Sequence, residues 1–223
     1  MELTTIYLVR HAMSMGNITG MFCGQTDVGL CDEGYYQLDF LARRFEDIHV
    51  DRMYSSPLTR AVETAKAANR SHKLDIILRY DLQEFDAGGF EKKTADELKR
   101  LYPVELDDYM NHPGRFCAPG GESMAQLRER SLKAIRRIAD ECRGLSVAVI
   151  THGDFIRSYT CALLGLSLDE QKSVRYNPNT GITRVDYDDG LNAKLIFSGD
   201  ADHLPKRELS ELEKYLMGDE LKG

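Results

Sequence analysis

Two histidines follow short apolar runs in matching settings, far apart in the chain. His11 comes after the run Ile6–Val9 and stands next to Arg10, and His152 comes after the run Val147–Ile150. A neutral imidazole can attack a phosphorus atom, and a guanidinium can bind the oxygens of a phosphoryl group. A single histidine at the end of a strand is often structural, but two in matched settings indicate a shared site. We therefore interpret His11 as a nucleophile and Arg10 as the cation that holds the phosphoryl group.

Three further segments contain groups that suit this chemistry. Arg60 lies near the start of an expected helix whose neighbouring positions are small, where a guanidinium either reaches the edge of a sheet or is solvated. Glu84 and Asp86 lie in a glycine-containing loop, which is either a turn with solvated acids or the source of a general acid whose pKa is raised by burial. The backbone N–H groups of Gly120–Ser123 either face an anion or belong to an ordinary capped helix start.

Bringing these groups together requires a sheet whose strands end at one edge. The apolar runs are too short for buried helices and contain many β-branched residues, which predicts strands. We expect strands at Ile6–Val9, Arg52–Tyr54, Leu74–Leu78, Val147–Ile150, Ile182–Tyr187 and Ala193–Phe197. Helices are expected from Asp32, from Pro57, over Thr94–Tyr102, from Ser123 and over Asp154–Leu164. This alternation predicts an α/β fold, a three-layer α/β/α sandwich around a mixed, mostly parallel sheet, with ligands at the carboxyl ends of the strands.

The composition limits the partners that the protein can have. The chain has 223 residues and a net charge of −7, which argues against non-specific binding to nucleic acid but allows a local pocket of buried arginines. Its five cysteines show no close pairing, which indicates free thiols in a reducing compartment. The amino-terminal residues lack the basic segment of a signal peptide, and no apolar run approaches the ~18 residues of a membrane span. We therefore expect a cytoplasmic protein that binds neither nucleic acid nor membrane.

No linker, internal repeat or low-complexity stretch divides the chain, so we expect a single domain over residues 1–223. The charged segment 206–217 is predicted to be a helical tail, with Leu209, Leu212 and Leu216 on one stripe. This stripe either docks on the body of the protein or contacts a partner, such as the second copy in a homodimer.

Five motifs stand in order and in register along the chain. They are Leu8-Val9-Arg10-His11 with Ser14 and Asn17, Ser55-Ser56-Pro57-Leu58 with Arg60, Ala61, Thr64 and Ala65, then Glu84, then Gly120-Gly121-Glu122-Ser123, and last Thr151-His152-Gly153. Together they resemble the histidine phosphatase superfamily, the phosphoglycerate mutase-like group of two-histidine phosphatases. The resemblance runs from about residue 3 to about residue 165 and includes the late hairpin, but does not cover the tail from about residue 199.

The resemblance implies a fold like that of phosphoglycerate mutase and a role for each matched residue. His11 would form a phosphohistidine, and Glu84 would protonate the leaving oxygen and then activate water. Arg10, Arg60 and His152 would bind the phosphoryl oxygens, and Asn17 would lie against the phosphate pocket. Neither metal nor cofactor is implied, and the six histidines show no metal-ligand spacing. The implied partner is a small phosphorylated metabolite.

Three positions depart from the family's usual pattern. The family usually has Gly at the position of Ala12 and often Glu at that of Met13. Ala12 fits if its φ is negative, and Met13 would remove a charge from the pocket wall. Lys92 stands where the family often has Gly after an aromatic–Glu pair. We expect these departures to affect the substrate wall and to leave the chemistry intact.

Hydrolysis of a small phosphomonoester is the activity we expect. Phosphoglycerate mutases of the family have a longer insertion and a Glu-Arg-His-Tyr-Gly stretch after the acid, where this chain has Glu84-Phe85-Asp86-Ala87-Gly88. A phosphoryl-transfer isomerase of the mutase type is the first alternative, and a non-catalytic phosphate-binding module is the second. We expect substrate specificity to come from the segments 20–30 and 104–121, whose sequences do not name a ligand.

Overall fold

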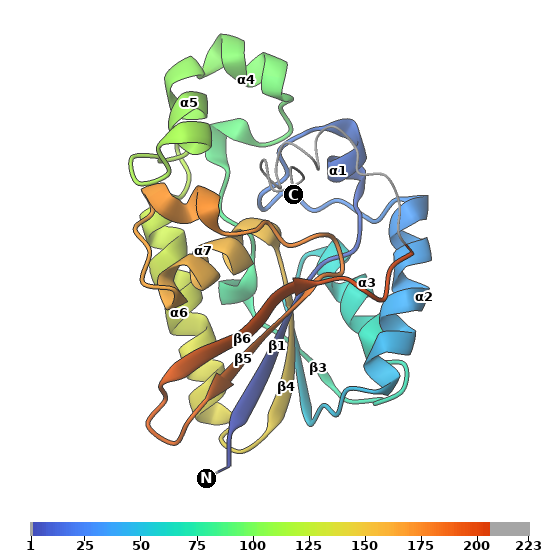
Figure 1. Ribbon diagram of the computed structural model, residues 1–223. Helices are drawn as coiled ribbons and strands as arrows, with labels where there is room; N and C mark the ends of the chain where they lie inside the picture. Colours follow the sequence, from blue (N-terminus) through green and yellow to red (C-terminus); the bar gives the residue numbers. More distant parts are fainter. Residues whose placement is uncertain (1, 206–223) are drawn as a thin grey trace.

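A six-stranded sheet forms the centre of the computed structural model, which describes residues 2–205 (Figure 1). The predicted helical tail at 206–217 lies outside the described residues. The order across the sheet is β3-β2-β4-β1-β5-β6. The strands are β1 (Thr4–Arg10), β2 (Arg52–Ser55), β3 (Ile76–Leu78), β4 (Ser146–Thr151), β5 (Ile182–Tyr187) and β6 (Ala193–Asp200).

The central pair of strands places both histidines at one edge of the sheet. Strand β1 runs parallel to β4, and the register pairs Arg10 with Thr151. His11 and His152 are each the next residue, so the two side chains leave the sheet side by side. Strands β2 and β3 continue the parallel part, whereas β5 runs antiparallel to β1 and β6 runs antiparallel to β5. The prediction of a mixed, mostly parallel sheet is confirmed.

Helices cover both faces of the sheet and complete three layers (Figure 1). One core contains Ile6 and Leu8 of β1 together with Leu127, Ile135 and Phe155 from helices α6 and α7. A second core lies on the opposite face, against α2 and α3. The helices are α1 (Met15–Thr19), α2 (Asp32–Glu46), α3 (Thr59–Ala68), α4 (Ala95–Leu101), α5 (Pro103–Asn111), α6 (Met124–Glu141) and α7 (Gly153–Leu163). Within residues 2–205, every helix is too short or too polar to cross a bilayer.

Some predicted boundaries differ from the structure. Pro57 was expected in the first turn of a helix, but α3 begins at Thr59 after the N-cap Leu58. Strand β3 has only three residues, Ile76–Leu78. Directly after the expected helix Thr94–Tyr102, Pro103 is the first residue of a further helix, α5, where the missing N–H of proline costs nothing. The short helix α1 forms in a segment for which no helix was expected.

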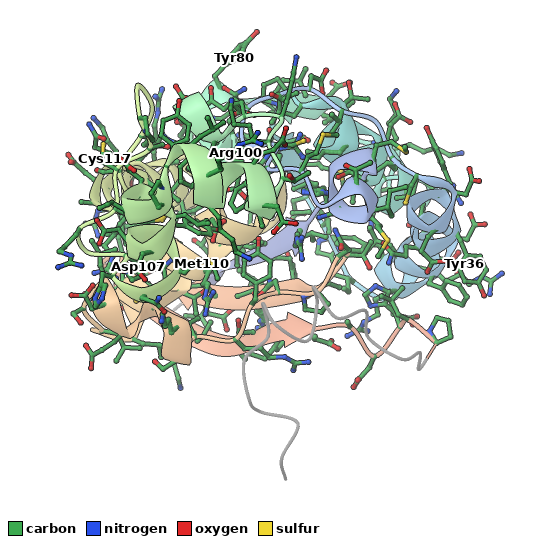
Figure 2. The ribbon with its side chains drawn as sticks, turned by 90° about the horizontal axis from the view of Figure 1, so that it is seen from above. Tyr36, Tyr80, Arg100, Asp107, Met110 and Cys117 are labelled. Carbon is green, nitrogen blue, oxygen red and sulfur yellow. The ribbon has the colours of Figure 1, made fainter. Side chains whose placement is uncertain are left out.

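The segment between β3 and α6 extends beyond the carboxyl edge of the sheet. Figure 1 shows its helices α4 and α5 above the ends of β1 and β4. In the view from above, these helices, which include Arg100, Asp107 and Met110, lie over the body of the molecule (Figure 2). Tyr109 of α5 packs edge-on against Phe22, with ring centroids 5.4 Å apart. This contact connects α5 to the long loop that follows α1.

Candidate active site

His11 follows β1 and has a defined proton position. Its backbone N–H donates to the carbonyl oxygen of Thr151 at 3.0 Å, which fixes the residue against β4. Its Nδ1 lies 2.7 Å from the carbonyl oxygen of Ala12. Because a carbonyl oxygen only accepts, Nδ1 bears the proton and Nε2 keeps its lone pair. Burial lowers the pKa of His11 well below its usual value, and the charges of Arg60 and Arg10 lower it further, so the ring is neutral at pH 7.

Arg10 lies beside His11 with part of its guanidinium unoccupied by protein groups. Its Nη1 donates to the carbonyl oxygen of Asn177 at 2.7 Å, and the group lies over the ring of Tyr176 at 4.7 Å. The buried Nε atom has no hydrogen-bond partner among the described residues. A buried donor of this kind is normally satisfied, and an anion in the adjacent cavity would satisfy it.

Arg60 lies in the first turn of α3, as the sequence predicted, and its side chain is only 1% exposed. Its guanidinium donates to three backbone carbonyls of the loop after α1: Thr26 at 2.9 Å, Cys23 at 3.0 Å and Gly24 at 2.7 Å. The interpretation as a solvated helix arginine is therefore wrong. Arg60 holds this loop against the sheet edge and places a buried positive charge beside His11.

Glu84 is the buried acid of the site. Its Oε1 accepts hydrogen bonds from the backbone N–H groups of Phe155 at 3.0 Å and Phe85 at 3.1 Å, and its Oε2 accepts one from Asp154 at 3.0 Å. Burial, followed by the negative charge of Asp154, raises the pKa of Glu84 to about 7 against the lowering effect of these hydrogen bonds. A carboxyl with this pKa exchanges a proton readily at neutral pH.

His152 lies behind His11 and does not line the cavity. The two rings are 5.2 Å apart, and His152 is fully buried. Its Nε2 lies 2.8 Å from the hydroxyl oxygen of Ser56, and its Nδ1 has no partner among the described residues. Burial, with the charge of Arg60 next, lowers the pKa of His152 well below its usual value. Both histidines are thus neutral bases in one buried cluster.

Asn17 lines the cavity, where the sequence placed it, and it also caps α1. Its Oδ1 accepts hydrogen bonds from the backbone N–H of Ser14 at 2.9 Å and from the Ser14 hydroxyl at 3.0 Å. The side-chain amide of Asn179 donates to the carbonyl oxygen of His11 at 2.9 Å. Asn17 and Asn179 therefore stiffen the turn that follows the nucleophile.

A cavity of about 150 Å³ opens beside these groups. Its lining includes five of the six predicted site residues and several that sequence reasoning missed. The predicted ones are Arg10, His11, Asn17 and Arg60 together with Glu84, and the missed ones include Phe22, Phe85, Tyr109, Asp154 and Tyr176. Of the missed residues, Asp154 could have been predicted from the sequence, because it directly follows the Thr151-His152-Gly153 motif. The cavity lining thus combines two arginines, several aromatic rings and two carboxyl groups, those of Glu84 and Asp154.

Gly120–Ser123 does not form an anion site. The N–H of Gly121 donates to the carbonyl oxygen of Ala118, and the N–H of Glu122 donates to that of Asp86. Ser123 caps α6 by accepting a hydrogen bond from the backbone N–H of Gln126 at 3.2 Å. Of the two interpretations left open by the sequence, the ordinary capped helix start is the correct one.

Comparison with known proteins identifies the family of this chain. The model of the histidine phosphatase superfamily, branch 1, matches residues 6–197. The chain belongs to this family. It is 30% identical over 165 residues to phosphoserine phosphatase 1 of Hydrogenobacter thermophilus, which covers 74% of this chain and 78% of the relative. It is 29% identical over 213 residues to the probable phosphoglycerate mutase GpmB of Escherichia coli, covering 94% of this chain and 99% of the relative.

Solved structures share the fold of this histidine phosphatase family member. Bacillus stearothermophilus YhfR superposes with a TM-score of 0.86 at 28% identity, covering 90% of this chain and 98% of that one. A phosphoserine phosphatase mutant from Entamoeba histolytica, solved in complex with phosphoserine, superposes with a TM-score of 0.80 at 23% identity, covering 91% of this chain and 100% of that one. The predicted phosphoglycerate mutase-like fold is confirmed.

The departures from the family pattern have structural explanations. The φ of Ala12 is not positive, so alanine fits at this position, and its N–H donates to the Thr64 hydroxyl at 2.9 Å. Lys92 has a φ of 60°, the left-handed region that favours the glycine usual in the family. Met13 was expected on the pocket wall, but its side chain is buried and does not line the cavity. The described residues contain no group of three or more potential metal ligands.

Proposed function

We propose that this chain hydrolyses a small phosphomonoester through a phosphohistidine on His11, within a single histidine phosphatase domain. The observation that carries the proposal is that two groups line the same cavity: His11, whose Nε2 is unprotonated, and Glu84, a carboxyl whose pKa is raised to about 7. The cationic groups of Arg10 and Arg60 lie at that end of the cavity. A nucleophile, an acid and charge-stabilising donors are the components that phosphoryl transfer requires.

The first step forms the covalent intermediate. The lone pair of His11 Nε2 attacks phosphorus, and the bond from phosphorus to the ester oxygen breaks. The leaving oxygen takes the proton of the Glu84 carboxyl and departs as an alcohol. Arg10 and Arg60 bind the phosphoryl oxygens and stabilise their negative charge. The fork of a guanidinium suits these oxygens better than a point charge does.

The second step releases phosphate. A water molecule gives a proton to the Glu84 carboxylate as its oxygen attacks phosphorus, and the bond between phosphorus and Nε2 breaks. His11 is again neutral and Glu84 is again protonated. We propose that His152 contacts the phosphoryl oxygens through Nδ1 once the phosphoryl group is bound to His11, whose ring centroid is 5.2 Å away. A Ser56 hydroxyl that donates to Nε2 leaves the proton on Nδ1, which has no partner among the described residues.

A mutase-type isomerase would use the same intermediate and return the phosphoryl group to the substrate. The relatives named as probable phosphoglycerate mutases support this candidate. The segment Glu84–Gly88, which departs from the mutase stretch, favours hydrolysis. The third possibility is a module that binds phosphate without turnover.

Phosphate release from a panel of small phosphomonoesters, compared between wild type and His11→Ala, tests the proposal. We expect release by wild type, none by the variant, and acid-labile, base-stable radiolabel on wild type after quenching with labelled substrate. Conversion between phosphoglycerate isomers without release would favour the mutase. Binding of inorganic phosphate without labelling or conversion would favour the non-catalytic module.

A further inference from the structure

Asp154 is a buried carboxylate on the wall of the active-site cavity that the chemistry described above does not use. It is the second residue of α7 and is only 5% exposed. Its Oδ2 accepts a hydrogen bond from the hydroxyl of Tyr109 at 2.9 Å. No Lys, Arg or His nitrogen among the described residues lies within ion-pair distance of this carboxylate (4.0 Å).

The two arginines whose charges favour the ionised form of Asp154, Arg157 and Arg10, form their hydrogen bonds with backbone carbonyls and not with Asp154. Arg157, one turn along α7, donates through Nε to the carbonyl oxygen of Gln171 at 2.9 Å and through Nη2 to that of Lys172 at 3.0 Å. Arg10 is bound to the carbonyl oxygen of Asn177. A buried carboxylate is costly unless it is paired, and the protein groups around Asp154 supply a single neutral donor. The pairing is therefore incomplete on the side that faces the cavity.

The position of Asp154 relative to Glu84 tells which part of a substrate it would meet. The backbone N–H of Asp154 donates to Glu84 Oε2, so the two carboxyl groups lie on adjacent parts of the wall. In the proposed reaction Glu84 protonates the leaving oxygen. A group that reaches Asp154 is then a few atoms from that oxygen, on the alcohol and not on the phosphoryl group.

We propose that Asp154 binds an ammonium group on the alcohol part of the substrate, so that the preferred substrates are phosphomonoesters of small amino alcohols. This inference rests on the proposed function. An ammonium completes the pairing of the carboxylate, whereas an uncharged hydroxyl supplies a donor without neutralising it. The cavity of about 150 Å³ limits the alcohol to a few heavy atoms. Phe85 and Tyr109 also line the cavity, so the wall beside Asp154 is partly aromatic.

Three phosphomonoesters of nearly equal size test the inference. O-phosphoethanolamine ends in an ammonium, 2-hydroxyethyl phosphate ends in a hydroxyl, and propyl phosphate ends in a methyl. We expect wild-type kcat/KM to be highest for the ammonium compound. We expect its ratio to propyl phosphate to fall roughly tenfold or more in Asp154→Asn, as for a lost hydrogen bond between charged groups. The ratio compares two substrates in one enzyme, so an effect of the substitution on Glu84 cancels.

A matched control separates a local effect from a change in net charge. Asp96→Asn removes the same charge from an exposed side chain of α4 and is expected to leave the ratio unchanged. Tyr109→Phe, which removes the hydroxyl bonded to Asp154, is expected to lower the ratio by a smaller factor than Asp154→Asn does. Equal wild-type rates for the ammonium and hydroxyl compounds, or an unchanged ratio in Asp154→Asn, would overturn the inference and leave the phosphatase proposal standing. Absence of phosphate release and of His11 labelling with all three compounds would overturn both.

Discussion

The backbone N–H of Asp154 donates to Oε2 of Glu84 at 3.0 Å, while the side chain of Asp154 places a second carboxylate beside the same group. The hydrogen bond favours the ionised form of Glu84, and the like charge disfavours it. Burial is the larger cause and raises the pKa of Glu84 to about 7. One residue therefore both fixes the orientation of the acid and adjusts its proton affinity.

Removing the charge of Asp154 is expected to lower the pKa of Glu84. Asp154→Asn keeps the backbone hydrogen bond but removes the like charge, so the ionised form of Glu84 becomes less costly. The alkaline limb of the pH–rate profile should move to lower pH. The measurement is kcat/KM against pH with propyl phosphate, a substrate that has no ammonium to bind. A limb that stays in place or moves to higher pH would contradict this account of Glu84.

Glu84→Gln is expected to lower kcat by a factor on the order of 10² to 10⁴, the usual contribution of general acid catalysis. The acid must be protonated to serve the leaving oxygen, so wild-type activity should fall as the pH rises through about 7. The residual activity of the variant should lack this limb, since an amide does not titrate. Persistence of the wild-type limb in Glu84→Gln would transfer the role to another group, with Asp86 the next candidate in the loop.

The same substitution is expected to remove a pH dependence from the stability of the fold. The pKa of Glu84 is raised in the folded state, so its contribution to stability is lost as the pH rises from 4.5 through about 7. By linkage, a shift of this size corresponds to up to about 3 kcal/mol. In urea unfolding, the free energy of wild type should fall by up to about 3 kcal/mol between about pH 4 and about pH 8, and that of Glu84→Gln should lack this fall, whatever fixed cost the amide adds by replacing one carboxylate acceptor. A difference that is independent of pH would show that Glu84 does not titrate as inferred.

Arg60→Lys is expected to have two effects at once: it loosens the loop after α1, and it reduces activity. A lysine keeps the charge but not the planar fork that donates to the carbonyls of Cys23, Gly24 and Thr26. We expect kcat/KM to fall by a factor on the order of 10², and limited proteolysis to cut within residues 20–30 sooner than in wild type. Arg70→Lys, on the exposed pair with Asp39, is the control and should change neither readout.

Gly153→Ala is expected to displace Tyr176. A methyl group at residue 153 would collide with the phenol of Tyr176, whose ring supports the Arg10 guanidinium. Overpacking of this kind costs about 1–3 kcal/mol of unfolding free energy and should also raise KM. Gly29→Ala is the matched control, because a methyl group there meets no neighbouring atom and the φ is not in the left-handed region. Equal unfolding free energies for the two variants would contradict the steric argument.

The parts of the fold and site that could be predicted from sequence are those governed by strand ends. The unbroken apolar runs before His11 and His152 predicted two buried strands, and the register of β1 with β4 brings these residues together. Arg60 was predicted at the correct turn of its helix, and Glu84 in the loop where burial gives it the required pKa. Each of these residues lies within a few positions of a well-patterned element.

The missed parts depend on contacts between segments that are distant in sequence. Helix α5 was missed because Pro103 both ends one helix and begins the next. Tyr109 donates to Asp154, which lies 45 positions further along the chain, and Tyr176 stacks against Arg10 although the two residues lie far apart in the sequence. Local pattern contains no information on such pairings. The boundaries of α1 were missed because a five-residue helix with a glycine has almost no periodic signal.

The hydrogen bond from Tyr109 to Asp154 joins two regions that differ in how closely they are tied to the sheet. The nucleophile and its arginines lie on strand ends and helix starts, where any change disturbs the sheet. Tyr109 belongs to the excursion between β3 and α6, which can lengthen, shorten or be exchanged without altering strand order. Changes confined to this segment therefore alter the alcohol side of the cavity and leave in place the strand ends that hold the phosphoryl chemistry.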